Sequence, residues 1–204
     1  MARKVGIFMT IEEKNMLFHW NYFLAFDADA EILSRYIEFT NDNYKTYSIE
    51  LIRLFLDAAS EVDVVSKLLC SKVNHNINDE KENRYDIIRK NYPGIKDMKI
   101  EIPRYGIILS PWKNWKNNEK ENKIPDWWNA YNNVKHHRDS RFKEGNLINT
   151  LNCISGLFCL LLYYYRDEAE NGTLRPHPNL FSVAGEFGGG FDIDESGFFK
   201  FYKL

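Results

Sequence analysis

The chain has 204 residues, of which 44% are hydrophobic, 27% are charged and 15% are aromatic. This composition is that of a globular protein with a bulky core, and it excludes wholesale disorder. The formal net charge is only −2, so the molecule as a whole has no field that would recruit nucleic acid or an anionic membrane. Binding of either kind would require a local patch.

We find no internal repeat and no low-complexity linker, and the sequence predicts a single domain over residues 1–204. The N-terminal residues lack the apolar stretch and cleavage site of a secretory signal. The three cysteines lie in apolar stretches without CxxC spacing, which predicts buried free thiols in a reducing compartment: Cys70, Cys153 and Cys159. We therefore expect a cytoplasmic protein.

The N-terminal third of the chain predicts two helices. Residues 27–39 show a helical pattern whose acidic start suits a helix N-terminus. Ser48 precedes an acidic residue closely enough to be a candidate N-cap. Residues 48–72 follow with apolar side chains at helical spacing, which predicts a long helix with one buried face: Ile52, Phe55, Ala59, Val62 and Leu69.

The middle of the chain is less regular. Residues 74–92 are strongly charged and predict either a solvated helix or a mobile connector. Residues 99–112 are β-prone and bracketed by prolines, so we expect one or two short strands there. Residues 113–125 are polar and predict a loop.

The C-terminal half predicts two more helices and a small β element. A helix begins at Pro125 and Asp126, and after a kink or loop at residues 139–145 a buried helix follows to residue 166. Polar residues interrupt the first half of this last helix, and the remaining apolar run is too short to cross a bilayer, so we expect no membrane span. Residues 178–204 alternate around glycine-rich turns, which indicates a hairpin or a small sheet. The predicted fold is mainly α, with its helical core at about residues 48–72 and 125–166.

The densest basic cluster of the chain lies at the end of the helix that begins near residue 125. On a helix Asn132 and His136 share one face, Lys135 and Arg138 flank it, and Arg141 extends the positive charge. Positive charge among stackable rings suits the phosphates and bases of RNA. Histidine exchanges protons near neutrality and cations stabilise the charge that develops on a cleaved phosphate, as metal-free RNA cleavage requires. In the structural alternative, Asn132 and His136 hydrogen-bond a neighbouring helix.

Acidic residues of the long helix could support this cluster. If the two helices pack side by side, Asp57 or Glu61 would orient His136 and neutralise the basic side chains. The alternative is a solvated helix face. A metal site is not predicted, because His136 and His137 diverge on a helix and no His-x3-His or paired cysteine is present. We expect no cofactor.

The segments SIELIRLFLDAASEVDVVSKLLC and WWNAYNNVKHHR, with NLINTLNCISGLFCLLLYYY after them, resemble the HEPN superfamily of helical-bundle proteins. This family occurs in prokaryotic toxin–antitoxin and abortive-infection systems. The resemblance implies an antiparallel helical bundle built on two long core helices. It also implies a kind of site, because catalytic members are dimeric, metal-independent endoribonucleases. Their motif is an arginine, a polar residue, three to five further residues and a histidine.

In this sequence His136 matches the motif histidine and Asn132 matches the polar residue, but Tyr131 occupies the arginine position. The motif is therefore incomplete, and Lys135 or Arg138 would have to hold the phosphate. The resemblance implies an RNA-associated protein of a defence or toxin–antitoxin system, a candidate endoribonuclease that forms a homodimer and pairs with an antitoxin or other partner protein. The alternative is a non-catalytic module that binds a partner protein or a nucleotide.

Overall fold

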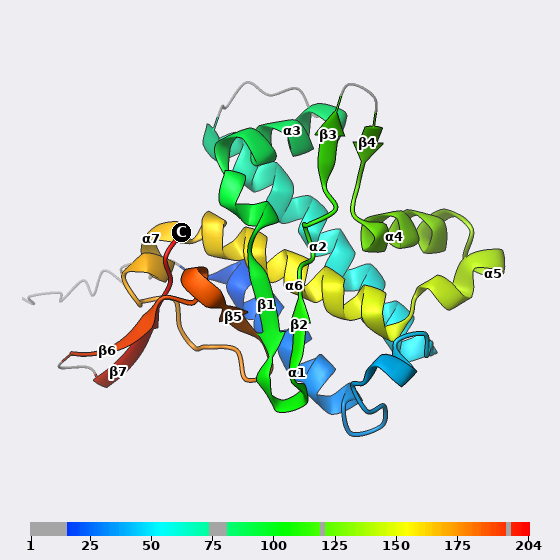
Figure 1. Ribbon diagram of the computed structural model, residues 1–204, viewed down its shortest axis with the longest axis horizontal. Coiled ribbons are helices and arrows are strands. Elements are labelled where there is room, and N and C mark those ends of the chain that lie inside the picture. The colour runs from blue at the N-terminus through cyan, green and yellow to red at the C-terminus, as the bar shows by residue number, and fades with distance from the viewer. Residues whose placement is uncertain (1–15, 74–80, 119–120, 195–196) are drawn as a thin grey trace, which may run out of the picture.

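The computed structural model describes residues 16–73, 81–118, 121–194 and 197–204 (Figure 1). It is mainly helical with a small antiparallel sheet, as predicted. Four helices form its centre: α1 (Phe18–Leu33), α2 (Ile49–Val73), α4 (Asp126–His136) and α6 (Leu147–Tyr164).

Helices α2 and α6 form the central pair of the bundle. Near their N-terminal ends the hydroxyl of Thr150 donates to the main-chain oxygen of Leu51 at 3.4 Å. Near their C-terminal ends Lys72 Nζ donates to the main-chain oxygen of Tyr164 at 2.5 Å. The two longest helices therefore run parallel to each other (Figure 1). The antiparallel contacts of the expected bundle are therefore made by other helices.

Helix α1 lies against one side of this pair and runs antiparallel to it. His19, near the start of α1, contacts Glu61 in the second half of α2. Leu33, at the end of α1, lines the same hollow as Glu50 near the start of α2.

Helix α4 also runs antiparallel to the pair. Trp127, in its first turn, lies beside Gly156 in the middle of α6. Asn133, in its last turns, hydrogen-bonds Glu144 just before α6 begins. The helices that run antiparallel to the long pair are thus its two shorter neighbours, α1 and α4.

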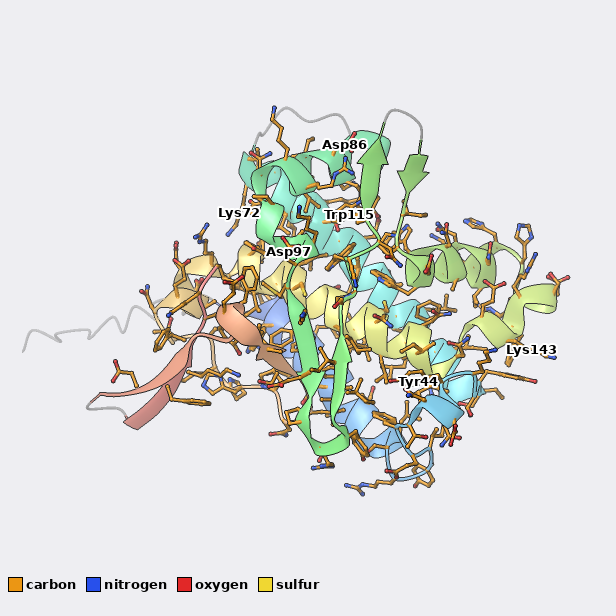
Figure 2. All side chains as sticks on the ribbon, in the orientation of Figure 1. Tyr44, Lys72, Asp86, Asp97, Trp115 and Lys143 are labelled. Atoms are coloured by element: carbon orange, nitrogen blue, oxygen red, sulfur yellow. The ribbon has the colours of Figure 1, made fainter. Side chains whose placement is uncertain are left out.

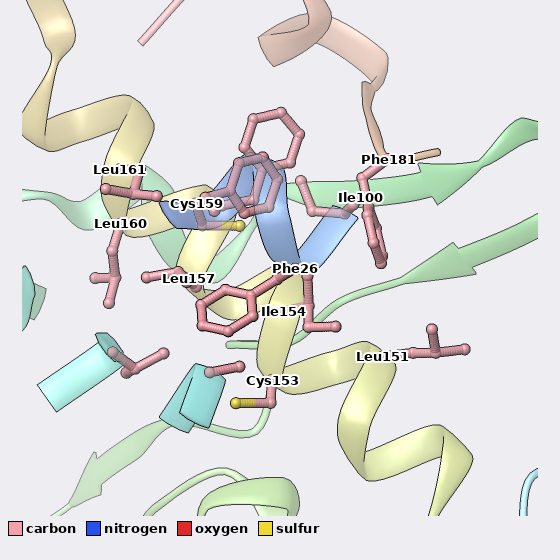
Figure 3. Close-up of a cluster of buried hydrophobic side chains, with 14 of the residues drawn as sticks. Phe26, Ile100, Leu151, Cys153, Ile154, Leu157, Cys159, Leu160, Leu161 and Phe181 are labelled. Atoms are coloured by element: carbon pink, nitrogen blue, oxygen red, sulfur yellow. The ribbon is translucent and has the colours of Figure 1, made fainter. Parts of the chain in front are cut away.

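Helix α6 is the core of the fold. Asn146 caps its N-terminus by accepting a hydrogen bond from the main-chain N–H of Asn149 at 3.2 Å. Among the described residues α6 is the one helix long and apolar enough to cross a membrane, and 78% of it is buried, as in the core of a soluble protein. Figure 3 shows side chains of α6 packed with Phe26 of α1, Ile100 and Phe181.

The three cysteines are free and buried, as predicted. Cys153 and Cys159 belong to α6, and Cys70 lies near the end of α2. Burial raises the pKa of the Cys70 thiol to about 11, so this group stays protonated at neutral pH.

The predicted N-cap of α2 is confirmed, whereas the predicted start of α1 is wrong. The N-cap at Ser48 is confirmed, since its hydroxyl accepts from the main-chain N–H of Leu51 at 3.1 Å. The helix predicted from residue 27 begins earlier, at Phe18, and Asp27 is buried within it. Its carboxylate accepts hydrogen bonds from the main-chain N–H groups of the C-terminal tail at 2.8–3.1 Å: Asn179, Leu180 and Phe181. The pKa of Asp27 is raised, because the effect of burial exceeds the opposing effect of these three hydrogen bonds, which lower the pKa.

A three-stranded antiparallel sheet covers part of the bundle, with the order β2–β1–β5. Ile100 of the central strand lies opposite Leu109 and Val183, and all three side chains are buried. The predicted mid-chain strands and C-terminal β element are therefore present. The sheet and the terminal hairpin comprise β1 (Lys99–Ile102), β2 (Ile107–Leu109), β5 (Ser182–Ala184), β6 (Gly190–Asp194) and β7 (Gly197–Phe201).

Of two other mid-chain segments, one is more ordered than the sequence predicted, and one contains the helix that was one of its two expected forms. The expected polar loop at residues 113–125 contains a hairpin of β3 (Lys116–Asn118) and β4 (Glu121–Lys123). Part of residues 74–92 forms α3 (Lys81–Asn91), while residues 74–80 lie outside the described part of the chain. The short helices α5 (Arg138–Arg141) and α7 (Arg166–Glu170) flank α6 at either end. Single 3₁₀ turns are η1 (Asn41–Asn43), η2 (Pro93–Lys96), η3 (Pro103–Tyr105), η4 (Phe142–Glu144) and η5 (Gly185–Gly188).

Candidate functional site

The first half of α4 is fixed to α6 by tryptophan side chains. Trp127 is 3% exposed, and its Nε1 donates to the main-chain oxygen of Pro111 at 2.8 Å. Trp112 packs against it at 5.2 Å between ring centroids and donates to the main-chain oxygen of Gly156 at 3.1 Å. A Cβ atom on Gly156 would lie 3.0 Å from Trp127 and 3.3 Å from Trp112. The glycine therefore allows both rings to approach the α6 backbone closely.

The last turn of α4 is exposed to solvent. Val134 is fully buried, whereas every residue from 135 to 141 is exposed. Helix α4 ends at His136, and α5 begins two residues later (Figure 1). Cations are favoured at a helix C-terminus because the helix dipole is negative there. We call these side chains the basic surface: Lys135, His136, His137, Arg138 and Arg141.

Most of the basic surface has no protein partner. In the part of the chain that the structure describes, the side chains of His136, His137 and Arg138 make no hydrogen bond or ion pair. Arg141 Nη1 contacts Glu144 Oε1 at 3.2 Å, and the second oxygen of Glu144 accepts from Asn133 at 2.8 Å. Glu144 is therefore the carboxylate that organises this end of the surface. Its i,i+3 spacing from Arg141 is the sequence signal that could have identified it.

Tyr131 lies beneath the basic surface and contributes little to its exterior. It is only 7% exposed, and its ring packs on Phe55 of α2 and on Trp128. Lys135 Nζ lies 5.3 Å from the centroid of the same ring. Tyr131 therefore positions Lys135 by a cation–π contact, which differs from the direct phosphate contact expected from the sequence. Asn132, on the next position, is half-buried.

The acidic residues expected to support His136 lie elsewhere. Glu61 is 7% exposed, and its Oε1 lies 2.5 Å from Nδ1 of His19 on α1. Asp57 lines a hollow that α2 shares with α1. Because α1 and α4 contact different faces of α2, neither carboxylate is brought to His136. The expectation that they orient His136 was wrong.

The pairing of His19 with Glu61 was not found from the sequence, in which His19 had no histidine or cysteine close by. His19 lines a hollow of about 470 Å³ together with Lys72, Tyr164 and Arg166. Its cations already have partners, since Lys72 binds the main-chain oxygen and ring of Tyr164, and Arg166 binds Glu170. The cations at this hollow are therefore occupied by protein partners, whereas most side chains of the basic surface are free to bind a ligand.

The fold and this surface define a mainly helical bundle protein with an exposed cationic region at the end of α4. Comparisons with protein-family models, with curated proteins and with solved structures found no match for the chain.

Proposed function

We propose that this protein is a cytoplasmic, RNA-associated protein of HEPN type, and that its basic surface contacts the RNA. The observation that supports this most is the exposure of His136, His137 and Arg138 without protein partners. A purely structural role would predict His136 packed beneath Trp127 or Trp128, but those rings are buried in the core and His136 is exposed.

The chemistry of the surface suits a single-stranded RNA. Lys135 and Arg138 offer charge-assisted hydrogen bonds to phosphate oxygens, and the guanidinium can bind two oxygens at once. The rings of His136 and His137 offer stacking faces for unpaired bases. The nearby carboxylates of Asp139 and Glu144 reduce the net positive charge of the basic surface. RNA binding would therefore depend on individual hydrogen bonds as well as on the overall electrostatic attraction.

We expect the double substitution Lys135→Ala and Arg138→Ala to weaken binding of a fluorescent single-stranded RNA by at least about tenfold. The slope of log affinity against log salt should fall by about 1.4, since each lost phosphate contact on a single strand contributes roughly 0.7. Fluorescence anisotropy over a salt series measures both quantities.

The control removes two exposed lysines that lie outside the basic surface, Lys90→Ala and Lys113→Ala. It should leave the affinity within about twofold, because these residues make no contact at the basic surface. Equal losses in both double variants would place the RNA elsewhere, and a wild-type protein that binds no RNA at low salt would contradict the proposed function.

A second candidate function is metal-independent RNA cleavage. The spacing of Asn132 and His136 favours it, and the resemblance implies that two copies would bring their basic surfaces together, with an antitoxin or other protein as a further partner. The burial of Tyr131 at the motif's arginine position argues against it. We therefore expect binding without turnover when the protein is incubated with RNA and a chelator. Cleavage that His136→Ala abolishes while binding persists would establish the catalytic alternative instead.

A further inference from the structure

The side of α1 that faces away from the core carries a stripe of exposed apolar side chains. Phe18 is 64% exposed, Tyr22 46% and Ile32 48%, and Tyr36 just beyond the helix is 81% exposed. With Ala25 and Asp29, both exposed, they occupy positions 18, 22, 25, 29, 32 and 36. Steps of four and three residues place side chains on one helical face, which is the spacing of a helix–helix interface. Exposed apolar side chains gathered on one face of a helix indicate an interaction site.

A hollow of about 240 Å³ lies next to this stripe, between α1 and the first half of α2. Its apolar lining comes from both helices, namely Phe26, Ile32, Leu33, Tyr36 and Leu54. The ring of Tyr22 packs on Phe26 at 4.5 Å and extends the apolar surface toward the start of α1. We call the hollow and its adjoining stripe the α1–α2 groove.

The charged side chains of the groove are mainly acidic. Asp29, Glu50 and Asp57 line it, and Arg53 is its one basic lining residue. Arg53 is bound to Glu50 at 2.6 Å. Within the described residues, the carboxylates of Asp29 and Asp57 have no hydrogen-bond or ion-pair partner. Burial and then the negative charges of Asp57 and Glu61 raise the pKa of Tyr22, in keeping with a negative potential along this face.

We propose that the α1–α2 groove binds a partner protein through an amphipathic helix whose apolar face is flanked by lysine or arginine. The apolar anchors of such a helix would enter the hollow, and its cations would reach Asp29 and Asp57. The aliphatic parts of the basic side chains can lie over Tyr22 and Tyr36, where a cation–π contact adds to the attraction.

The same charges disfavour other occupants. RNA phosphates would meet the unpaired carboxylates of Asp29 and Asp57. A second copy of this chain, paired by a two-fold axis, would bring two identical acidic faces together. The groove also lies across the long helix pair from α4, so a partner bound there leaves the basic surface free. This inference does not depend on the proposed RNA binding.

The test uses two synthetic helical peptides of about 18 residues, long enough for roughly five turns. One carries leucines at helical spacing flanked by lysines, and the other has glutamates in place of the lysines. The full-length protein should bind the lysine peptide and not the glutamate peptide. The double substitution Asp29→Lys and Asp57→Lys should weaken the lysine peptide by at least about tenfold and create affinity for the glutamate peptide. Ile32→Ser with Tyr36→Ser should weaken binding to a similar extent without reversing the charge preference.

Each variant has a control at exposed positions outside the groove. Glu38→Lys with Asp42→Lys makes the same change in net charge, and Ile108→Ser removes an apolar side chain that is 62% exposed on β2. All positions are on the surface, and circular dichroism checks that the fold is kept. Equal peptide binding in groove and control variants would overturn the proposal. The proposal would also be overturned if the wild-type protein formed a dimer that Tyr36→Ser dissociates or that Asp29→Lys with Asp57→Lys stabilises. Either result would mean that the groove joins two copies of the chain.

Discussion

Replacing Trp127 by alanine is expected to lower the free energy of unfolding by about 3–5 kcal/mol. The indole is almost fully buried, packs against Trp112 and Trp128, and donates a hydrogen bond to Pro111. Removing it leaves a cavity between α4 and α6 and an unpaired carbonyl group. Urea denaturation followed by circular dichroism at 222 nm measures the loss, because the described part of the chain is mainly helical and helices dominate the signal at that wavelength.

The control for this variant is Trp127→Phe, which keeps an aromatic ring but cannot donate to Pro111. We expect it to cost roughly 1–3 kcal/mol, because a smaller void remains and one buried acceptor loses its partner. The RNA affinity of both variants should match the wild type under conditions where they are folded, since Trp127 does not reach the basic surface. Equal stability of the alanine and phenylalanine variants would contradict the packing described for α4.

Arg84→Ala is expected to have the second-largest effect on stability. Arg84 is 3% exposed and joins α3 to α2, because its Nη1 donates to Asp63 Oδ1 at 2.9 Å and to the Asp63 main-chain oxygen at 3.3 Å. Breaking a fully buried ion pair costs about 3–5 kcal/mol. Asp63 remains partly exposed and keeps Lys67 at 3.3 Å, so we expect about 2–3 kcal/mol here. Thermal and urea unfolding measure it.

Arg89→Ala on the same helix is the matched control. Arg89 also pairs with an aspartate, Asp86, but within α3 and at a half-exposed site. Such a pair contributes roughly 0–1 kcal/mol, so the two arginine variants should differ clearly in stability. If Arg89→Ala were as destabilising as Arg84→Ala, the ion pair to Asp63 would not be the connection that holds α3.

Features set by neighbouring residues could be predicted from the sequence. The long helices at residues 49–73 and 147–164 follow from apolar spacing, and the cap at Ser48 from the residue types around it. The position of the basic surface followed from the same kind of reasoning. These features depend on contacts within a few residues along the chain, and such contacts leave a local pattern.

Features set by distant contacts could not be predicted in this way. The carboxylate of Asp27 accepts from the N–H of Phe181, 154 positions away, so an acidic residue in mid-helix was mistaken for a helix start. Glu61 meets His19 across 42 positions, and nothing in the helical spacing of α2 tells which face meets α1 and which meets α4. The burial of Tyr131 has the same origin, because Phe55 and Trp128 cover it only once α2 and α4 pack.

The close approach at Gly156 has an evolutionary consequence. The glycine, Trp112 and Trp127 form one steric unit, since a single added carbon at position 156 would meet both rings at 3.0–3.3 Å. In a homologue with this fold, a larger residue at position 156 would require a smaller side chain in place of one of the two tryptophans. Conversely, replacing either tryptophan by a smaller residue would leave a void unless the residue at position 156 became larger. The three positions should therefore covary among descendants of a common ancestor, as a record of the contact between α4 and α6.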